Sequence, residues 1–184
     1  MSNLTTKAIK ESFFTLLSKK SIDQITVRDI TTLCGVSRNT FYYHYEDITA
    51  LLEEMMTEMV DELIEKYPSI ASLEQGVEVA VEFVLQIKTA AMHVYNSDRR
   101  FIYERSLMRL CRHVSKTMVT SAVPEGKVTD EERELLINYY KCMCFGFIID
   151  WCDNGLKPGY AENFKKLIEL RKNLFGFLLE DLSE

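Results

Sequence analysis

Hydrophobic residues recur at helical spacing along almost the whole chain. Near the N-terminus, Ile9, Phe13, Leu16 and Leu17 stand at positions i, i+4, i+7 and i+8, on one face of a helix. Later segments repeat this period, and no run of alternating apolar and polar residues indicates a strand. The chain has only 7 Gly and 3 Pro, which leaves few turns for a many-stranded sheet. The pattern predicts an all-α protein.

Capping signals and breaks divide this pattern into about nine helices. Thr26 and Asp29 form a capping box that opens a short helix, and Gly35 after it is expected at positive φ. Ser37 is placed to cap another short helix that ends near His44. The later helices are predicted from Asp47 to near Pro68, from Ser72 through Ala91, from Asn96–Asp98 through Met118, from Thr129 (with Glu132) through Trp151, and over 161–181.

Residues 26–45, TVRDITTLCGVSRNTFYYHY, combine two short helices with a turn at Gly35. This arrangement is typical of a helix-turn-helix motif. The residues expected to face inward are Val27, Ile30, Leu33, Val36 and Phe41. Arg38 and Asn39 then lie exposed at the start of the second helix, where their side chains suit guanine and adenine edges in the major groove. Thr26 and Arg28, at the front of the first helix, can reach phosphates.

The charge distribution supports this location. The net charge of −6 would by itself argue against nucleic acid. Residues 1–45, however, carry six Lys/Arg and three acidic residues, a net charge of +3, whereas residues 46–184 carry 16 basic and 25 acidic residues, a net charge of −9. A phosphate-binding surface is therefore expected in the first quarter of the chain.

Other features indicate a cytoplasmic protein. The longest uninterrupted apolar run, Cys142–Ile149, has 8 residues, well below the ~20 of a membrane span. The N-terminus lacks the apolar region of a signal peptide. Five cysteines without a CxxC motif suit a reducing compartment, and Cys111, Cys142, Cys144 and Cys152 are expected as buried core thiols rather than as a redox sensor or soft-metal site.

The stretch ITVRDITTLCGVSRNTFYYHYEDITALL, residues 25–52, with the helices before and after it, resembles the TetR/AcrR family of bacterial transcriptional regulators. Thr40–His44 matches the family's T-[LF]-Y-x-H signature. The resemblance implies that Tyr42 and His44 contact backbone phosphates and that residues 37–40 approach bases. The predicted DNA-contacting residues are Thr26, Arg28, Ser37, Arg38, Asn39, Thr40, Tyr42, Tyr43 and His44.

The chain departs from the family pattern at the start of the next helix. The family commonly has a phosphate-binding lysine there, whereas this chain has Glu46-Asp47-Ile48. The two acids weaken attraction to the DNA backbone, although the helix dipole and its free N–H groups remain. Cations that can compensate are Lys7, Lys10, Lys19 and Lys20.

The resemblance implies a helix-turn-helix DNA-binding domain at 1–46 and a helical effector-binding and dimerisation domain at 47–184. Phe147–Gly155 is similar to the W-x-x-x-G end of the family's penultimate helix, which implies dimerisation through the last two helices, 130–181. A small-molecule pocket is expected among aromatic residues and methionines: Phe83, Met92, Tyr95, Phe101, Met108, Tyr139, Phe147 and Trp151.

The expected function is that of a ligand-responsive repressor that reads a pseudo-palindromic operator as a homodimer. A TetR-like coactivator that binds another regulator is the alternative, kept open by Glu46 and Asp47. An enzyme is disfavoured because no G-x-S-x-G, HExxH or Walker sequence occurs and no Glu is followed by His at i+3, as di-metal bundles require. No cofactor and no metal are expected.

Overall fold

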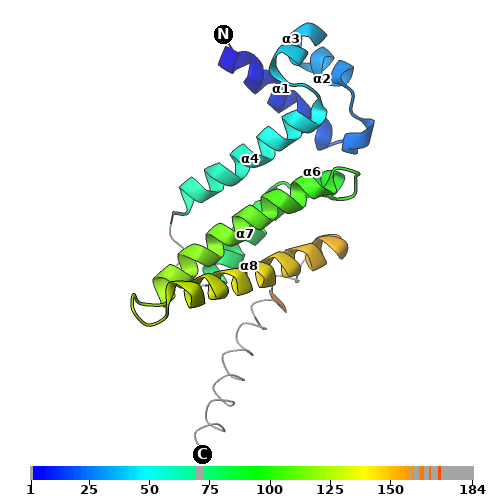
Figure 1. Ribbon diagram of the computed structural model, residues 1–184. Coiled ribbons are helices and arrows are strands. Elements are labelled where there is room, and N and C mark those ends of the chain that lie inside the picture. Colours follow the sequence, from blue (N-terminus) through cyan, green and yellow to red (C-terminus); the bar gives the residue numbers. More distant parts are fainter. Residues whose placement is uncertain are drawn as a thin grey trace, which may run out of the picture. The chain divides into compact units, whose positions relative to one another are not determined.

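A computed structural model describes residues 2–68 and 73–157, together with 159, 162, 163, 166 and 170. Within this part of the chain every regular element is a helix (Figure 1), which confirms the predicted all-α class. The predicted cap at Ser72 lies outside the described residues, and so does most of the predicted last helix, 161–181. None of the described helices is both long and apolar enough to cross a lipid bilayer.

The described elements are, in order, α1 (Ser2–Leu17), a short 3-10 turn η1 (Ile22–Gln24), α2 (Val27–Cys34), α3 (Arg38–His44), α4 (Ile48–Lys66), α5 (Leu73–Gln86), α6 (Lys88–Tyr95), α7 (Arg100–Ala122) and α8 (Asp130–Asp153). Their contacts form two compact units. The first comprises residues 1–68 and 86–113, and the second comprises residues 69–85 and 114–184. These compact units differ from the predicted functional domains, 1–46 and 47–184. The division into those two domains stays a prediction.

Local caps fix the helix boundaries of the first unit. The Thr26 hydroxyl accepts the Asp29 N–H at 3.2 Å, while the Asp29 carboxylate accepts the Thr26 N–H at 3.0 Å, which completes the predicted capping box. Gly35 ends α2 with φ 73°, a left-handed conformation that glycine adopts without strain. Ser37 and Asp47 cap α3 and α4 through the N–H groups of the third helical residues.

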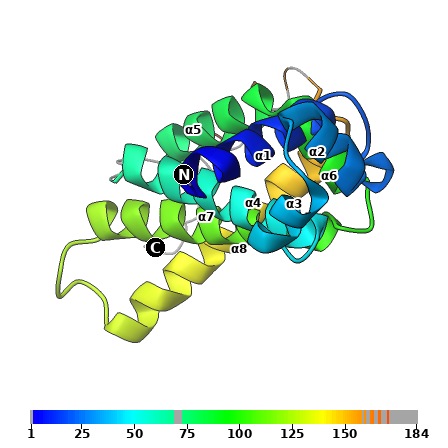
Figure 2. The same cartoon turned by 90° about the horizontal axis from the view of Figure 1, so that it is seen from above.

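In the first unit, α1 packs against α2 and α6, and α2 packs against α3. Both views draw α2 and α3 next to one another at the N-terminal part of the chain (Figures 1 and 2). The large side chains buried in its core include those of Ile9, Phe13, Ile22, Ile30, Phe41, Leu51, Leu52 and Ile102. Polar ties reinforce this packing, since His93 Nδ1 lies 2.6 Å from the Leu17 carbonyl and so links α6 to the end of α1.

Leu33 corrects the predicted set of inward residues, because its side chain is 51% exposed. On the eight-residue helix α2, the buried residues are Ile30, as predicted, and Thr31, which was not predicted. Thr31 can be buried because its hydroxyl donates to the Arg28 carbonyl at 3.2 Å. Ile30 and Phe41 are fully buried as expected.

The second unit contains α5, the later part of α7 and all of α8. Thr129 and Glu132 form the predicted capping box of α8. The Arg133 guanidinium donates to the carbonyls of Val123 and Pro124, at 3.0 and 3.2 Å, and so closes the loop between α7 and α8. At the other end of α8, the Trp151 indole N–H donates to the Lys157 carbonyl at 2.9 Å.

The predicted helix through Ala91 is two helices, because the chain breaks between α5 and α6. Ile87 has φ −107° and ψ 14°, and no side chain caps α6. The break coincides with the boundary of the two compact units, which falls between Leu85 and Gln86. The two halves of the predicted helix therefore pack in different units.

Candidate DNA-binding surface

The start of α3 presents an exposed polar and aromatic face. Arg38 and Asn39 are exposed, and the side chains of Tyr42 and Tyr43 are 56% and 84% exposed. Phe41, between them in sequence, is fully buried and anchors the helix, with the Tyr42 ring packed edge-on at a centroid distance of 5.6 Å. The helix is thus fixed through one face and leaves the other open to a partner.

Ser37 and Thr40 form a pair at the helix start. Their hydroxyl oxygens are 2.8 Å apart, and the Thr40 N–H donates to Ser37 Oγ at 3.0 Å. A hydroxyl group has one donor hydrogen and two acceptor lone pairs, so each side chain retains capacity for a further hydrogen bond. Both predicted contact residues therefore lie together at the N-terminus of α3, with Ser37 exposed and Thr40 half-buried.

Tyr45, at the C-cap of α3, points the other way. It is buried, and its hydroxyl donates to the Glu54 carboxylate on α4 at 3.1 Å. Burial, together with the negative charge of Glu54, raises the pKa of Tyr45 well above its usual range. Lys10 on α1 approaches the same carboxylate at 2.6 Å. This link between α1, α3 and α4 carries no sequence signature, because its members are far apart along the chain.

Two of the remaining predicted contact residues lie on α2 or at its cap. Arg28 is exposed and forms no ion pair with the described residues. Thr26 is an exposed residue, and its hydroxyl is engaged in the capping box. Hydrogen bonds from Lys20, at 2.9 Å, and from Thr26 lower the pKa of Asp29 to about 2, so this carboxylate is ionised at neutral pH.

His44, in the last turn of α3, is half-buried, and its ring lies 5.1 Å from that of Tyr43 in an edge-to-face arrangement. The structure thus brings the exposed side chains of α3 together on one surface, with Arg28 nearby in sequence on α2.

The four lysines expected to compensate for Glu46 and Asp47 have different surroundings. Lys10 is engaged by Glu54 and Glu58, both at 2.6 Å, and Lys20 by Asp29. Partial burial disfavours the charged form of Lys10, but the hydrogen bonds to Glu54 and Glu58 outweigh it and raise the pKa of this lysine.

Lys7 and Lys19 remain more available. Lys7 lies 3.9 Å from Glu11 in an exposed pair, which has little strength in water. Lys19 is exposed and has no ion pair among the described residues. Of the four lysines, Lys7 and Lys19 are therefore the two that remain available to offset the negative charges of Glu46 and Asp47 near DNA.

The start of α4 differs from a phosphate site. The Asp47 carboxylate accepts the Ala50 N–H at 2.8 Å and so occupies one of the N–H groups that a phosphate would need. Glu46 is exposed, and Ile48 is half-buried.

The residues predicted to line an effector pocket fall in both compact units. Met92, Tyr95, Phe101 and Met108 belong to the first unit, and Phe83, Tyr139, Phe147 and Trp151 belong to the second. Phe101 and Tyr139 are more than half exposed, while Tyr95 and Trp151 are buried. Tyr95 is covered by the Arg100 guanidinium at 3.9 Å. None of the eight lines either of the two cavities described within the first unit.

The cysteines divide into buried and accessible thiols. Cys111, Cys144 and Cys152 are buried as expected, whereas Cys142 is exposed on α8. Burial raises the pKa of the Cys144 thiol to about 11, so it is protonated and unreactive at neutral pH. The described residues contain no group of three or more His, Cys, Asp or Glu side chains arranged to hold a metal ion.

Two family profiles match the chain. Residues 14–55 match "Bacterial regulatory proteins, tetR family", and residues 71–173 match "Transcriptional regulator C-terminal region". The first match spans α2, α3 and parts of the helices on either side, which is the exposed surface described above.

Two individual proteins with similar sequences also carry the names of HTH-type transcriptional regulators. The chain is 23% identical to the "HTH-type transcriptional repressor KstR2" of Rhodococcus jostii (strain RHA1), over 69% of this chain and 70% of that protein. It is 24% identical to the "Uncharacterized HTH-type transcriptional regulator YxbF" of Bacillus subtilis (strain 168), over 91% of this chain but 45% of that protein, so it spans about half of YxbF.

Two solved structures share the fold at 16% identity. "Dihydroxyacetone kinase operon activator DhaS" superposes with a TM-score of 0.71 over 90% of this chain and 93% of its own. A TetR transcriptional regulator from Rhodococcus sp. RHA1 superposes with a TM-score of 0.57 over 92% and 97%. The two profiles, one of which matches more than half of the residues, identify the chain as a member of the TetR family of DNA-binding transcriptional regulators.

Proposed function

We propose that this regulator is a ligand-responsive repressor that reads a pseudo-palindromic operator as a homodimer. The observation that carries the proposal is the exposed face of α3. A capped helix held by a buried Phe41 while Arg38, Asn39, Tyr42 and Tyr43 remain open to solvent is the arrangement that a major-groove reading helix needs.

The proposed contacts divide by chemistry. Arg38 and Asn39 offer paired donors and acceptors to base edges, with the Ser37 and Thr40 hydroxyls beside them. Phosphate contacts, which hold the protein in register without reading sequence, are assigned to Thr26, Arg28, Tyr42, Tyr43 and His44.

Dimerisation through α8 and the helix predicted after it is supported by an exposed apolar face. Leu135 and Tyr139 are 64% and 55% exposed, and Cys142 and Gly146 continue the same helix face at spacings of three and four. Two copies related by a two-fold axis bury such a face against itself. Two copies of α3 related by the same axis then call for an operator with matching symmetry.

The repressor assignment is supported by the name of the relative KstR2. In the proposed mechanism, an effector bound within residues 47–184 favours a dimer in which the two α3 helices no longer fit successive major grooves. The effector acts by its higher affinity for that conformation, and DNA affinity falls by the same factor.

The test is selection of fragments from the source genome by the purified protein, followed by fluorescence anisotropy on an enriched fragment. The expected result is a pseudo-palindromic site bound by a dimer in light scattering, with loss of selection in Arg38→Ala. Selection of asymmetric sites, or a monomer at micromolar concentration, would contradict the operator and dimer proposals respectively.

A second candidate is a TetR-like coactivator that binds another regulator instead of an operator. Glu46 and Asp47 add negative charge beside α3. Lys10 and Lys20 are paired with carboxylates, which leaves fewer cations available to DNA. The structurally similar DhaS is itself titled an operon activator. Failure to enrich any fragment at low salt, by a protein that is folded and dimeric, would favour this candidate.

A further inference from the structure

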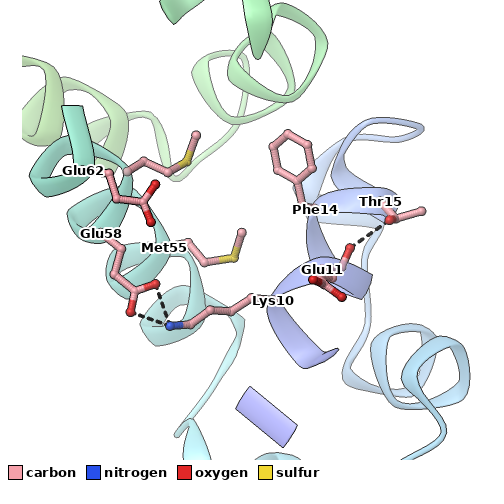
Figure 3. Close-up of a pocket in the computed structure, with 8 residues that line it drawn as sticks. Lys10, Glu11, Phe14, Thr15, Met55, Glu58 and Glu62 are labelled. Atoms are coloured by element: carbon pink, nitrogen blue, oxygen red, sulfur yellow. Dashed lines mark hydrogen bonds and ion pairs between the residues drawn. The ribbon is translucent and has the colours of Figure 1, made fainter. Parts of the chain in front are cut away.

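A groove runs between α1 and α4 within the first unit (Figure 3). Its cavity volume is about 360 Å³, and its walls are formed by Lys10, Glu11, Phe14, Thr15, Met55, Glu58, Met59 and Glu62. It is separate from the exposed face of α3 and contains none of the residues predicted for the effector pocket. Its volume is that of a site for a small organic molecule.

The inner surface of the groove is apolar. Phe14, Met55 and Met59 are half-buried, and the same three side chains also line a second, fully apolar space of about 20 Å³ that α6 and α7 close from the other side. A space of this size without polar partners does not hold an ordered water. Methionine side chains adapt their shape and are polarisable, so they suit a planar or branched apolar group.

The rim of the groove is acidic. Three glutamates and a single lysine line it, and Figure 3 shows the Lys10 ammonium held by Glu58. The same ammonium lies 2.6 Å from the Glu54 carboxylate. Glu62 is exposed and forms no ion pair with the described residues. The groove thus joins an apolar surface to a carboxylate that no described cation neutralises.

We propose that this groove is a second small-molecule site, selective for an organic monocation with an apolar body. The apolar body lies against Phe14, Met55 and Met59, and the positive charge lies near Glu62. Anions are repelled by the Glu62 carboxylate, because Glu58 is paired with Lys10 and Glu11 lies 3.9 Å from Lys7. Small hydrated cations gain nothing from the apolar surface. The proposal does not depend on DNA binding, so it can fail while the proposed function stands.

The experiment uses rhodamine 6G, a fluorescent organic monocation, and measures its fluorescence polarisation with the full-length protein. We expect saturable binding of one dye per chain. Decyltrimethylammonium, below its micellar concentration, should displace the dye, whereas tetramethylammonium at the same concentration should not, because it lacks the apolar chain.

The matched variants are Glu62→Lys and Glu65→Lys, which make the same charge change on α4. Glu62 lines the groove and Glu65 does not, although both are exposed. Glu62→Lys should weaken dye binding by about tenfold or more and Glu65→Lys by less than about twofold, since exposed charges act over short distances at physiological salt. Equal weakening by the two variants, an absence of saturable binding, or displacement by tetramethylammonium would each overturn the proposal.

Discussion

The Tyr45 hydroxyl donates a 3.1 Å hydrogen bond to the Glu54 carboxylate, which joins the C-cap of α3 to α4. Lys10 of α1 lies 2.6 Å from the same carboxylate. A single glutamate therefore connects three helices around the DNA-binding motif. Because α3 has only seven residues, its orientation depends on contacts of this kind more than on its own hydrogen bonds.

Removing the Tyr45 hydroxyl should lower stability. Tyr45→Phe keeps the buried ring but loses a hydrogen bond to a charged acceptor, and we expect a cost of about 1.5–3 kcal/mol in the free energy of unfolding. Urea denaturation followed by circular dichroism measures it. Tyr43→Phe, at an 84% exposed position, is the matched control and should change stability little. Equal stabilities of the two variants would show that the Tyr45 bond contributes nothing.

Asp29 should make folding sensitive to acid. Its pKa is lowered from 3.8 to about 2, chiefly by the hydrogen bond from Lys20 and then by those from Thr26. A carboxylate with a lowered pKa stabilises the folded state above its unfolded pKa, and that contribution is lost as the pH falls from about 4 to about 2. Asp29→Asn should therefore flatten the pH dependence of stability in this window.

Thermal unfolding between pH 5 and pH 2 measures this effect. Lys20→Met removes the main cause of the lowered pKa without touching the carboxylate, so it should also flatten the dependence, to a smaller degree. A variant Asp29→Asn that loses stability with acid as steeply as the natural chain would contradict the assignment.

The helix caps could be predicted from the sequence, whereas the ion pairs between helices could not. Thr26, Ser37, Asp47 and Thr129 each act on a residue three positions away, so the local sequence specifies them. The ion pairs of Lys10 with Glu54 and Glu58 join positions more than 40 residues apart. Nothing in the local pattern of either helix reveals which lysine meets which glutamate.

Two other features, the exposure of Leu33 and the break at Ile87, also could not be predicted from the local sequence. Spacing places Leu33 on the buried face with Ile30, but in the structure Leu33 is exposed and Thr31 is buried beside Ile30. The break at Ile87 has neither a Gly nor a Pro to signal it, and it lies next to the boundary between the two compact units. The exposed positions of α3 were predicted correctly because polar side chains, a cap and a buried Phe41 coincide there.

Substitutions on α3 should separate base reading from phosphate binding. Arg38→Ala and Asn39→Ala should each cost about 1–3 kcal/mol on the selected operator and relax preference at particular bases. Tyr42→Phe should weaken binding to all sequences alike, because a phosphate contact carries no base information. Anisotropy with operator variants measures both effects, and uniform loss in Arg38→Ala would assign it to the backbone.

Ile48→Lys tests whether the start of α4 faces DNA. A cation there would add the phosphate contact that the family commonly has, so affinity should rise at low salt and the salt dependence should steepen by up to about one unit of slope. Asp47 is left in place because its carboxylate caps the helix through the Ala50 N–H. A folded variant without a gain at low salt would show that this helix start does not approach a phosphate.

Trp151 should stabilise the turn at the end of α8 through its buried ring and its hydrogen bond. Its side chain is 3% exposed, its indole N–H donates to the Lys157 carbonyl at 2.9 Å, and its own carbonyl accepts the N–H of the fully buried Leu156 at 2.9 Å. Since it is the single tryptophan of the chain, its fluorescence reports this turn alone. We expect a blue-shifted emission in the native protein that moves to longer wavelength on denaturation.

Two substitutions at this position separate the ring from its hydrogen bond. Trp151→Ala should cost about 3–5 kcal/mol, because it leaves a cavity where the largest side chain of the helix end was packed. Trp151→Phe keeps most of the apolar volume, so its cost should come mainly from leaving the Lys157 carbonyl without the indole donor, about 1–3 kcal/mol. Chemical denaturation followed by circular dichroism compares them, since neither variant retains the fluorophore. Similar costs for the two would show that the hydrogen bond, rather than the packing of the ring, holds the turn after α8, whereas an emission of the natural chain at the fully exposed wavelength would contradict the buried position itself.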